Sequence, residues 1–249
     1  MSETSPRVLV FQHIALEHPG VFRDFLREDG IEWTAIELDE GESIPDLDAY
    51  DALWVMGGPM DVWEDDIHPW LEPERAAIRE AVVERKMPFF GFCLGHQLLA
   101  QALGGEVGPA KTPEIGILEV ELTEAGRASR IFSGLPEVHS CLQWHSAEVL
   151  RPPPGARTLA ASRDCAVQAL GFAGHAFSIQ YHVEITGDTV PQWGAVPEYE
   201  QALERAMGDG ALATFEADAA AHMAEFNRNA RGIYDNFMGI VRQSPARAA

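Results

Sequence analysis

The chain has 249 residues, 46% of them hydrophobic, and a formal net charge of -21. This length and apolar content suit one sizeable globular domain, so we expect a single domain over residues 1–249. The excess of Asp and Glu (39) over Lys and Arg (18) disfavours nucleic-acid and anionic-membrane partners, because such partners need basic patches.

The N-terminal residues and the cysteines bear on the cellular compartment. Residues 1–7 are polar and lack the apolar segment of a secretory signal, and no apolar run reaches the roughly 20 residues that span a bilayer. Cys93, Cys141 and Cys165 are odd in number and show no CxxC spacing, which disfavours a disulfide framework or a zinc site. We therefore expect a cytoplasmic protein.

Strands and helices alternate in the first part of the chain. Short apolar runs predict strands over residues 7–11, 32–38, 52–56 and 88–92, and helical spacing of apolar side chains predicts helices over 18–29, 73–86 and 94–103. This alternation indicates a doubly wound α/β fold, with a mostly parallel sheet and helices on both faces.

The pattern changes after Gly104-Gly105. Successive strands with few helices between them are predicted over residues 117–122, 138–144, 157–161, 166–172 and 176–181, which indicates a small antiparallel or mixed extension of the sheet. Residues 186–249 then read as a helical extension of the same domain, with a break at 208–210 and an interruption or bend of the last helix near Gly232.

The sharpest motif is Gly91-Phe92-Cys93-Leu94-Gly95. A nucleophile flanked by glycines between a buried strand and a helix is typical of a nucleophile elbow, in which small residues let the strand and helix pass closely. The N-terminus of the helix that begins at Leu94 would stabilise negative charge on the sulfur. Most cysteines are inert packing residues, but this setting favours Cys93 as a nucleophile.

A second motif contains a histidine and a carboxylate. His182 and Glu184 follow an apolar strand, and residues i and i+2 of an extended chain share a face. The carboxylate can then orient the imidazole and stabilise its charged form. Alone, this spacing also fits a surface pair at the edge of a sheet.

A third, weaker motif is Met56-Gly57-Gly58-Pro59 at a strand end. Two glycines permit φ > 0, which can turn backbone N–H groups toward an oxyanion. An ordinary turn is the alternative explanation.

Together these three motifs resemble the class I glutamine amidotransferase family, over most of residues 7–185. The similarity is greatest to stand-alone relatives of the GMP synthase glutaminase domain. The resemblance implies Cys93 as nucleophile, His182 as general base and acid, and Glu184 as its orienting group. It further implies an oxyanion hole from the backbone N–H groups of Gly58 and Leu94. It places the substrate site at Gly57, Gln97, Gln143, Trp144 and His145.

This sequence departs from the family at two places. Val183 stands where the family usually has proline, and the stretch from Gln143 to Glu148 replaces a Ser-His-Gly-Asp-like wall of the glutamine site, so the substrate preference is open. The chain also lacks the phosphate-binding loops that would activate an acceptor with ATP. Any ammonia would therefore be used by a separate synthase subunit, or not used.

The resemblance implies hydrolysis of glutamine, or of a related γ-glutamyl small molecule, without a cofactor or a metal. One alternative is a γ-glutamyl peptidase or hydrolase that expels another amine, and another is a non-catalytic regulatory or binding subunit. An α/β-hydrolase is disfavoured because its acid precedes the histidine. A zinc site at His139, Cys141 and His145 lacks further ligands at metal spacing. We expect residues 186–210, including Trp193, to border the active site, although a surface connection fits them almost as well.

Overall fold

The computed structural model describes residues 5–244 and contains one nine-stranded sheet. Its strands are β1 (Arg7–Gln12), β2 (Glu32–Glu37), β3 (Ala52–Val55), β4 (Phe89–Phe92), β5 (Glu106–Leu122), β6 (Val138–Arg151), β7 (Ala156–Ala161), β8 (Ala169–Phe172) and β9 (Ala176–Ile179). They lie in the order β2-β1-β3-β4-β9-β8-β7-β5-β6. The pairs from β2 to β9 are parallel and those from β9 to β6 are antiparallel. The predicted α/β fold is confirmed.

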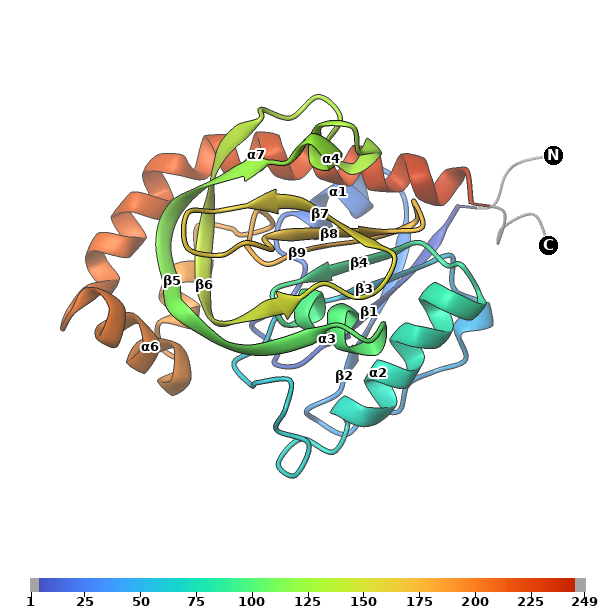
Figure 1. Ribbon diagram of the computed structural model, residues 1–249, viewed down its shortest axis with the longest axis horizontal. Coiled ribbons are helices and arrows are strands. Elements are labelled where there is room, and N and C mark those ends of the chain that lie inside the picture. Colours follow the sequence, from blue (N-terminus) through green and yellow to red (C-terminus); the bar gives the residue numbers. More distant parts are fainter. Residues whose placement is uncertain (1–4, 245–249) are drawn as a thin grey trace.

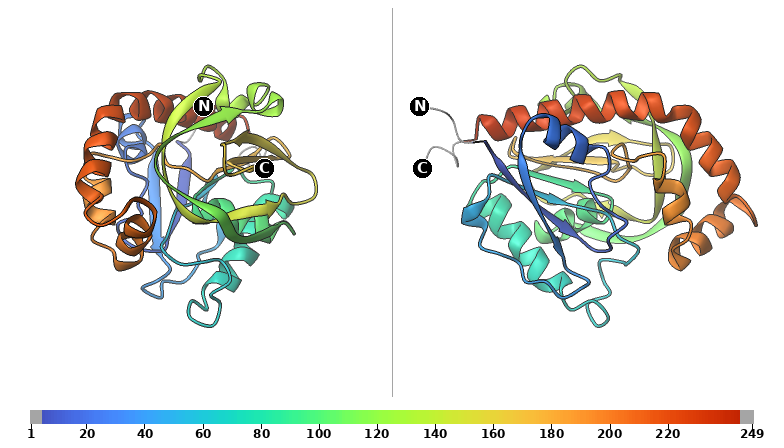
Figure 2. Two further views of the ribbon diagram at one scale, coloured as in Figure 1. Left: turned by 60° about the vertical axis from the view of Figure 1, so that its left-hand side comes forward. Right: turned by 180° about the vertical axis from the view of Figure 1, so that it is seen from behind.

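Helices cover both faces of the parallel strands (Figures 1 and 2). The alternation of side chains in β1 explains this, since Val8 and Val10 belong to one buried cluster and Leu9 and Phe11 to another. Helices α1 (Phe22–Glu28) and α7 (Leu212–Arg242) pack on the first cluster. Helices α2 (Leu71–Arg79) and α3 (Leu94–Ala102) pack on the second, and α2 continues into the π-helical turn Glu80–Glu84.

The antiparallel part is larger than the sequence predicted. Strand β5 has 17 residues and β6 has 14, and Figure 1 shows them as a long curved pair beside the other strands. Their pairing shifts register between Pro109 and Glu114. A proline cannot donate to the ladder, so Pro109 and Pro113 hid the first part of β5 from an interpretation based on sequence pattern.

The interruption predicted in the last helix is wrong, because α7 runs unbroken for 31 residues. Gly232 has a packing role instead, since a Cβ atom there would lie 2.9 Å from Cδ1 of Leu135. The predicted break before this helix is present, with φ 90° at Gly208 and φ 75° at Gly210. No helix within residues 5–244 is both long and apolar enough to cross a membrane.

Two shorter helices lie between β9 and α7. These are α5 (Thr189–Trp193) and α6 (Pro197–Met207), which pack with the first turns of α7 in a third buried cluster around Trp144 and Phe215. The remaining helical turns are α4 (Glu124–Arg127) and the 3-10 turns Leu47–Ala49 and Arg130–Phe132.

Candidate active site

Cys93 stands at the turn between β4 and α3. Its backbone has φ 47° and ψ -102°, outside the regions that residues with side chains normally adopt. Its N–H donates to the Ile179 carbonyl of β9 at 2.9 Å, and the N–H of Gly95 donates to the Met56 carbonyl at 3.1 Å. Neighbouring strands therefore hold the strained turn that the sequence predicted.

Two glycines allow β4 and α3 to meet at this turn. A Cβ atom on Gly91 would lie 2.5 Å from the Gly95 carbonyl oxygen, and one on Gly95 would lie 2.1 Å from the Val55 carbonyl oxygen. Both distances are below any normal contact, so the elbow excludes side chains at these positions, as the motif predicted.

His182 and Glu184 face each other near this turn. His182 Nδ1 lies 2.6 Å from Oε1 of Glu184, and both side chains are buried. The segment is not the strand that the i, i+2 spacing assumed, since β9 ends at Ile179. Instead, His182 makes an isolated bridge with Leu142 of β6, through N–H to carbonyl bonds of 2.9 and 3.2 Å.

The loop before α1 holds the backbone of Glu184. The Val21 N–H donates to the Glu184 carbonyl at 2.7 Å. A Cβ atom on Gly20 would lie 1.8 Å from that same oxygen, and Gly20 has φ 49°. Gly20 is therefore required both by its conformation and by the close approach. The dipeptide Pro19-Gly20 is the sequence signal for this turn, although it falls within the helix predicted over residues 18–29.

The electrostatics favour a charged His182. Burial opposes a charge on the ring, but the Glu184 carboxylate and a hydrogen bond with Cys93 outweigh it and raise the pKa of His182 well above its usual range. The protonated ring is therefore the form that this environment favours. This is the state that pairs with a thiolate and can deliver a proton to a leaving group.

Gly57 and Gly58 follow β3, but neither adopts the positive φ that we expected of them. Close packing explains instead why both positions are glycine, because neighbouring side chains leave no room for a Cβ atom. A Cβ atom on Gly57 would lie 2.5 Å from Oε2 of Glu17, and one on Gly58 would lie 3.0 Å from His13 and from Leu94. Gly58 and Leu94 line the same cavity as Cys93, where their N–H groups could meet an oxyanion.

Two glutamines form a chain next to the sulfur. Gln180 Nε2 lies 3.5 Å from Cys93 Sγ, and Gln180 Oε1 accepts from Gln97 Nε2 at 3.1 Å. Gln97 also donates to the Ala147 carbonyl at 3.3 Å. No role for Gln180 was predicted from the sequence. Its position, two residues before His182 in the same motif, was the signal that could have indicated one.

The cavity beside Cys93 has a volume of about 250 Å³. Of the five residues expected to bind substrate, Gln97, Trp144 and His145 line it. Gly57 and Gln143 are not among its lining residues, and Gln143 is fully buried. The structure thus brings together the elbow, the Gly58 peptide and the central part of the predicted wall.

The segment that follows Glu184 borders this cavity. The Trp193 ring of α5 meets the His182 ring at a centroid distance of 4.7 Å and an angle of 72°. Helix α6 contributes lining residues, which include Glu198, Tyr199 and Arg205. The placement expected for residues 186–210 is therefore observed, because α6 lines the cavity that contains Cys93.

A buried carboxyl group joins α6 to the loop after β1. The Tyr199 hydroxyl donates to Oε1 of Glu17. Burial raises the pKa of Glu17 to about 7, although the nearby His182 and the Tyr199 hydrogen bond oppose this shift. Glu17 was not identified from the sequence.

The other candidate metal ligands bond to protein groups. His139 lies 3.2 Å from the Tyr181 hydroxyl, and Cys141 donates to the Leu118 carbonyl. The structure groups His145 instead with Glu114 and Cys165, whose ligand atoms lie within 4.8 Å of one another. Glu114 accepts hydrogen bonds from His145, Ser162 and Gln168. Burial raises the pKa of the Cys165 thiol to about 12, which disfavours the thiolate that would bind a metal.

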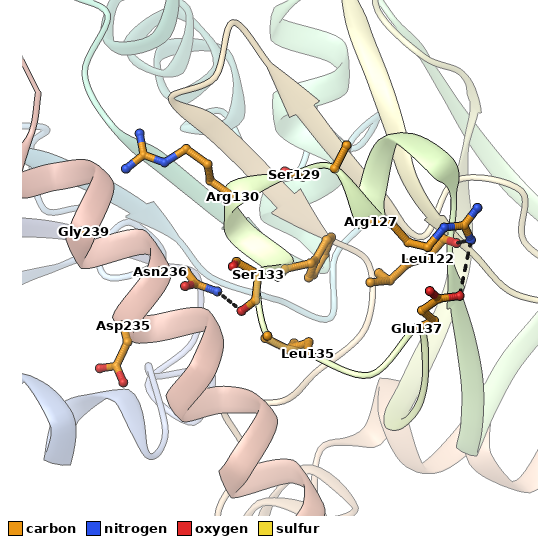
Figure 3. A pocket seen from close by; sticks show the side chains of 13 residues that line it. Leu122, Arg127, Ser129, Arg130, Ser133, Leu135, Glu137, Asp235, Asn236 and Gly239 are labelled. Carbon is orange, nitrogen blue, oxygen red and sulfur yellow. Dashed lines mark hydrogen bonds and ion pairs between the residues drawn. The ribbon is translucent and has the colours of Figure 1, made fainter.

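A second cavity, of about 490 Å³, lies between α7 and the turn Arg130–Phe132 (Figure 3). Its polar groups bond to protein partners. Arg127 lies 3.8 Å from Glu137, Arg130 donates to Gln243, and Asn236 donates to the Ser133 carbonyl. Neither the cysteines nor the histidines line it, so the groups suited to catalysis gather at Cys93.

Known proteins resemble this chain in sequence. The model of the family described as glutamine amidotransferase class-I matches residues 22–191. The GMP synthase (glutamine-hydrolyzing) of Aeropyrum pernix is 39% identical over 129 residues, but these cover 52% of this chain and only 23% of that protein. A GMP synthase (glutamine-hydrolyzing) subunit of Sulfolobus acidocaldarius is 34% identical over 157 residues, 63% of this chain and 78% of that protein. Gamma-glutamyl peptidase 3 of Arabidopsis thaliana is 29% identical over 171 residues, 66% of this chain and 68% of that protein.

Solved structures share the fold. A glutamine amidotransferase from Thermotoga maritima superposes with a TM-score of 0.83 at 26% identity, covering 94% of this chain and 98% of that one. A glutamine amidotransferase from Methylobacillus flagellatus gives a TM-score of 0.83 at 29% identity, covering 95% and 96% of the two chains.

Proposed function

The chain belongs to the class I glutamine amidotransferase family, a family of enzymes, and we propose that it hydrolyses the side-chain amide of glutamine or of another γ-glutamyl compound through a thioester on Cys93. The observation that supports this most directly is the strained Cys93 turn beside the buried His182–Glu184 pair. A nucleophile, its base and the group that orients the base occur together, and the nucleophile lines the cavity.

In the first step the Cys93 sulfur attacks the amide carbon, and the carbonyl electrons move onto the oxygen. The N–H groups of Gly58 and Leu94 stabilise that oxyanion. The carbonyl then re-forms and the C–N bond breaks, while the protonated His182 gives its proton to the departing nitrogen. Ammonia or an amine leaves, and a γ-glutamyl thioester remains.

In the second step water attacks the thioester and loses a proton to His182. The tetrahedral intermediate collapses, the C–S bond breaks, and glutamate leaves. Glu184 stabilises the charge on His182 throughout, because its carboxylate accepts from Nδ1 at 2.6 Å. The sulfur returns as a thiolate beside a protonated ring, so the balance of the cycle is amide plus water giving acid plus amine.

Two leaving groups are compatible with this site. Ammonia would come from glutamine, and the description of the Sulfolobus acidocaldarius relative as one subunit of a synthase supports a separate synthase chain as the consumer of ammonia. A larger amine would make the protein a γ-glutamyl peptidase. The polar side chains of Glu198 and Arg205 at the cavity favour this second candidate, because they could contact the part of a substrate beyond the scissile bond.

The test is release of glutamate by the purified protein from glutamine and from a panel of γ-glutamyl amides. Added hydroxylamine should intercept the thioester and yield γ-glutamyl hydroxamate, and Cys93→Ala should abolish both products. Failure of the wild-type protein to turn over any of these amides would refute the proposal and favour a non-catalytic binding role. Undiminished release by Cys93→Ala would refute the mechanism.

A further inference from the structure

A second buried histidine–carboxylate pair contacts the Gly57–Gly58 peptide, whose N–H group is a proposed oxyanion donor. His13 follows β1 directly, and its ring bridges two acceptors. Nδ1 lies 2.8 Å from the Gly57 carbonyl oxygen, and Nε2 lies 2.9 Å from Oε1 of Glu74 on α2. His13 is 1% exposed and Glu74 is 0% exposed. Neither residue belongs to the triad or lines the cavity.

The hydrogen bonds define the charge on His13. Against an ionised Glu74 and the Gly57 carbonyl, both of which accept, the ring satisfies its two partners when both nitrogens carry hydrogen. Burial opposes that charge, but Glu74 and the bond to Gly57 outweigh it and raise the pKa of His13. Glu17 and Glu37 also act on this ring, and Trp70 stacks on it at a centroid distance of 5.2 Å. The ionised carboxylates among these neighbours favour the cation.

Peptide geometry carries the effect of this cation to the active site. The Gly57–Gly58 peptide is planar and trans, so its carbonyl and its N–H point in opposite directions. A Gly57 carbonyl held toward His13 therefore holds the Gly58 N–H away from His13. Gly58 lies between His13 and Leu94 and lines the cavity with Cys93. This orientation suits a Gly58 N–H that faces the cavity.

The charge should also strengthen the donor. A cation bonded to the carbonyl draws electron density from the peptide, and chains of hydrogen bonds strengthen one another in a low-dielectric interior. The benefit is greatest when the substrate oxygen carries a negative charge, as it does in the transition state. A more weakly charged ground state gains less, so the effect should appear in kcat rather than in KM.

We infer that His13 and Glu74 are positioning residues, which hold an imidazolium against the Gly57 carbonyl and so orient and polarise the Gly58 N–H of the oxyanion hole. This inference rests on the proposed function. It gives the site two histidine–glutamate pairs with different duties. His182–Glu184 moves protons, and His13–Glu74 keeps a fixed charge behind a peptide group.

The test compares Glu74→Gln with His13→Asn. Glu74→Gln keeps the side-chain volume but removes the negative charge, and should lower kcat by about ten- to a hundredfold while KM changes less than about threefold. His13→Asn removes the ring and leaves at most a neutral N–H donor near the Gly57 carbonyl, so it should lower kcat at least as much as Glu74→Gln does. Thr123→Val is the control, because it removes a helix cap far from the cavity and should leave kcat unchanged.

A second readout separates positioning from misfolding. Iodoacetamide alkylates a thiolate by displacement and needs no oxyanion hole, so the rate of Cys93 alkylation should stay within about twofold in both variants. Cys141 and Cys165 are buried, and burial raises the pKa of both thiols. A kcat equal to wild type in Glu74→Gln, or an equal fall in kcat and alkylation rate, would overturn the inference while leaving the proposed function intact. A wild-type protein that is alkylated but hydrolyses no amide would overturn the proposed function itself.

Discussion

The parallel and antiparallel parts of the sheet contribute differently to the active site. The ends of β3 and β4 supply the oxyanion peptide and Cys93, and contacts with neighbouring backbone fix both turns. The wall facing Cys93 comes from β6 and α6, where Trp144 and Tyr199 are held by ring packing between segments far apart in sequence. The parallel part therefore fixes the nucleophile and the oxyanion peptide, whereas His182 also depends on its backbone bridge to Leu142 of β6.

The largest expected effect tests the parallel part. Cys93→Ala removes only the sulfur from a turn shaped by glycines, so amide hydrolysis should fall by at least about ten-thousandfold while the melting temperature stays near wild type. Glutamate release and thermal unfolding measure the two quantities. Cys165→Ala is the matched control and should keep the wild-type rate, since Cys165 does not itself line the cavity.

A smaller effect is expected at Glu184. Glu184→Gln removes the negative charge that stabilises the His182 cation. Because the Glu184 carboxylate forms no bond to substrate, kcat should fall by only about a hundred- to a thousandfold. Steady-state kinetics on the most active amide would measure it, with KM expected to stay within about threefold. A variant as fast as wild type would reduce the triad to a cysteine–histidine dyad.

Glu17 joins the two parts, and its titration should appear in stability. Its folded-state pKa of about 7 exceeds the ordinary value of 4.5. Between these pH values the folded protein keeps a proton that the unfolded chain has lost. The free energy of unfolding contributed by this group is thus fully present below about pH 4.5 and is lost as pH rises through about 7.

Replacement of this carboxyl group should remove that dependence. As pH rises from 4.5 to 8, the wild-type protein should lose about 3 kcal/mol in free energy of unfolding through Glu17, at about 1.4 kcal/mol per pKa unit. Glu17→Gln has no such group and should not show this loss. Urea denaturation at both pH values measures this difference. Glu84→Gln removes a charge from an exposed site and should leave the wild-type pH dependence unchanged. An equal pH dependence in Glu17→Gln would contradict the assignment.

The smallest expected effect concerns the part of the cavity lining that β6 and α6 contribute. Arg205 is exposed at the cavity, so Arg205→Ala should change kcat/KM by about three- to tenfold, and differently for different γ-glutamyl leaving groups. Arg228→Ala is the control, because it removes an exposed arginine of α7 that does not line the cavity, and kcat/KM should stay unchanged. A uniform change across all amides would show that this wall does not select the leaving group.

Prediction from sequence succeeded where the signal is local. The Cys93 elbow depends on five consecutive residues, and the His182–Glu184 contact depends on three, although its backbone is a bridge and not a strand. The crowding around Gly57 and Gly58 and the burial of His13 depend on segments that meet only in the fold. No spacing rule could identify those partners, because they lie tens of residues apart.

The Gly20 contact with the Glu184 carbonyl has a consequence for the order in which the protein matures. These residues are separated by most of the α/β domain, and closing such a long loop is slow compared with forming helices and hairpins. During synthesis the first strand and helix must wait for the catalytic carboxylate to emerge before the loop can close on it. Hydrolytic activity should therefore appear only after the sheet is complete. During refolding, the rate at which activity recovers should report the rate at which the contact between Gly20 and the Glu184 carbonyl forms.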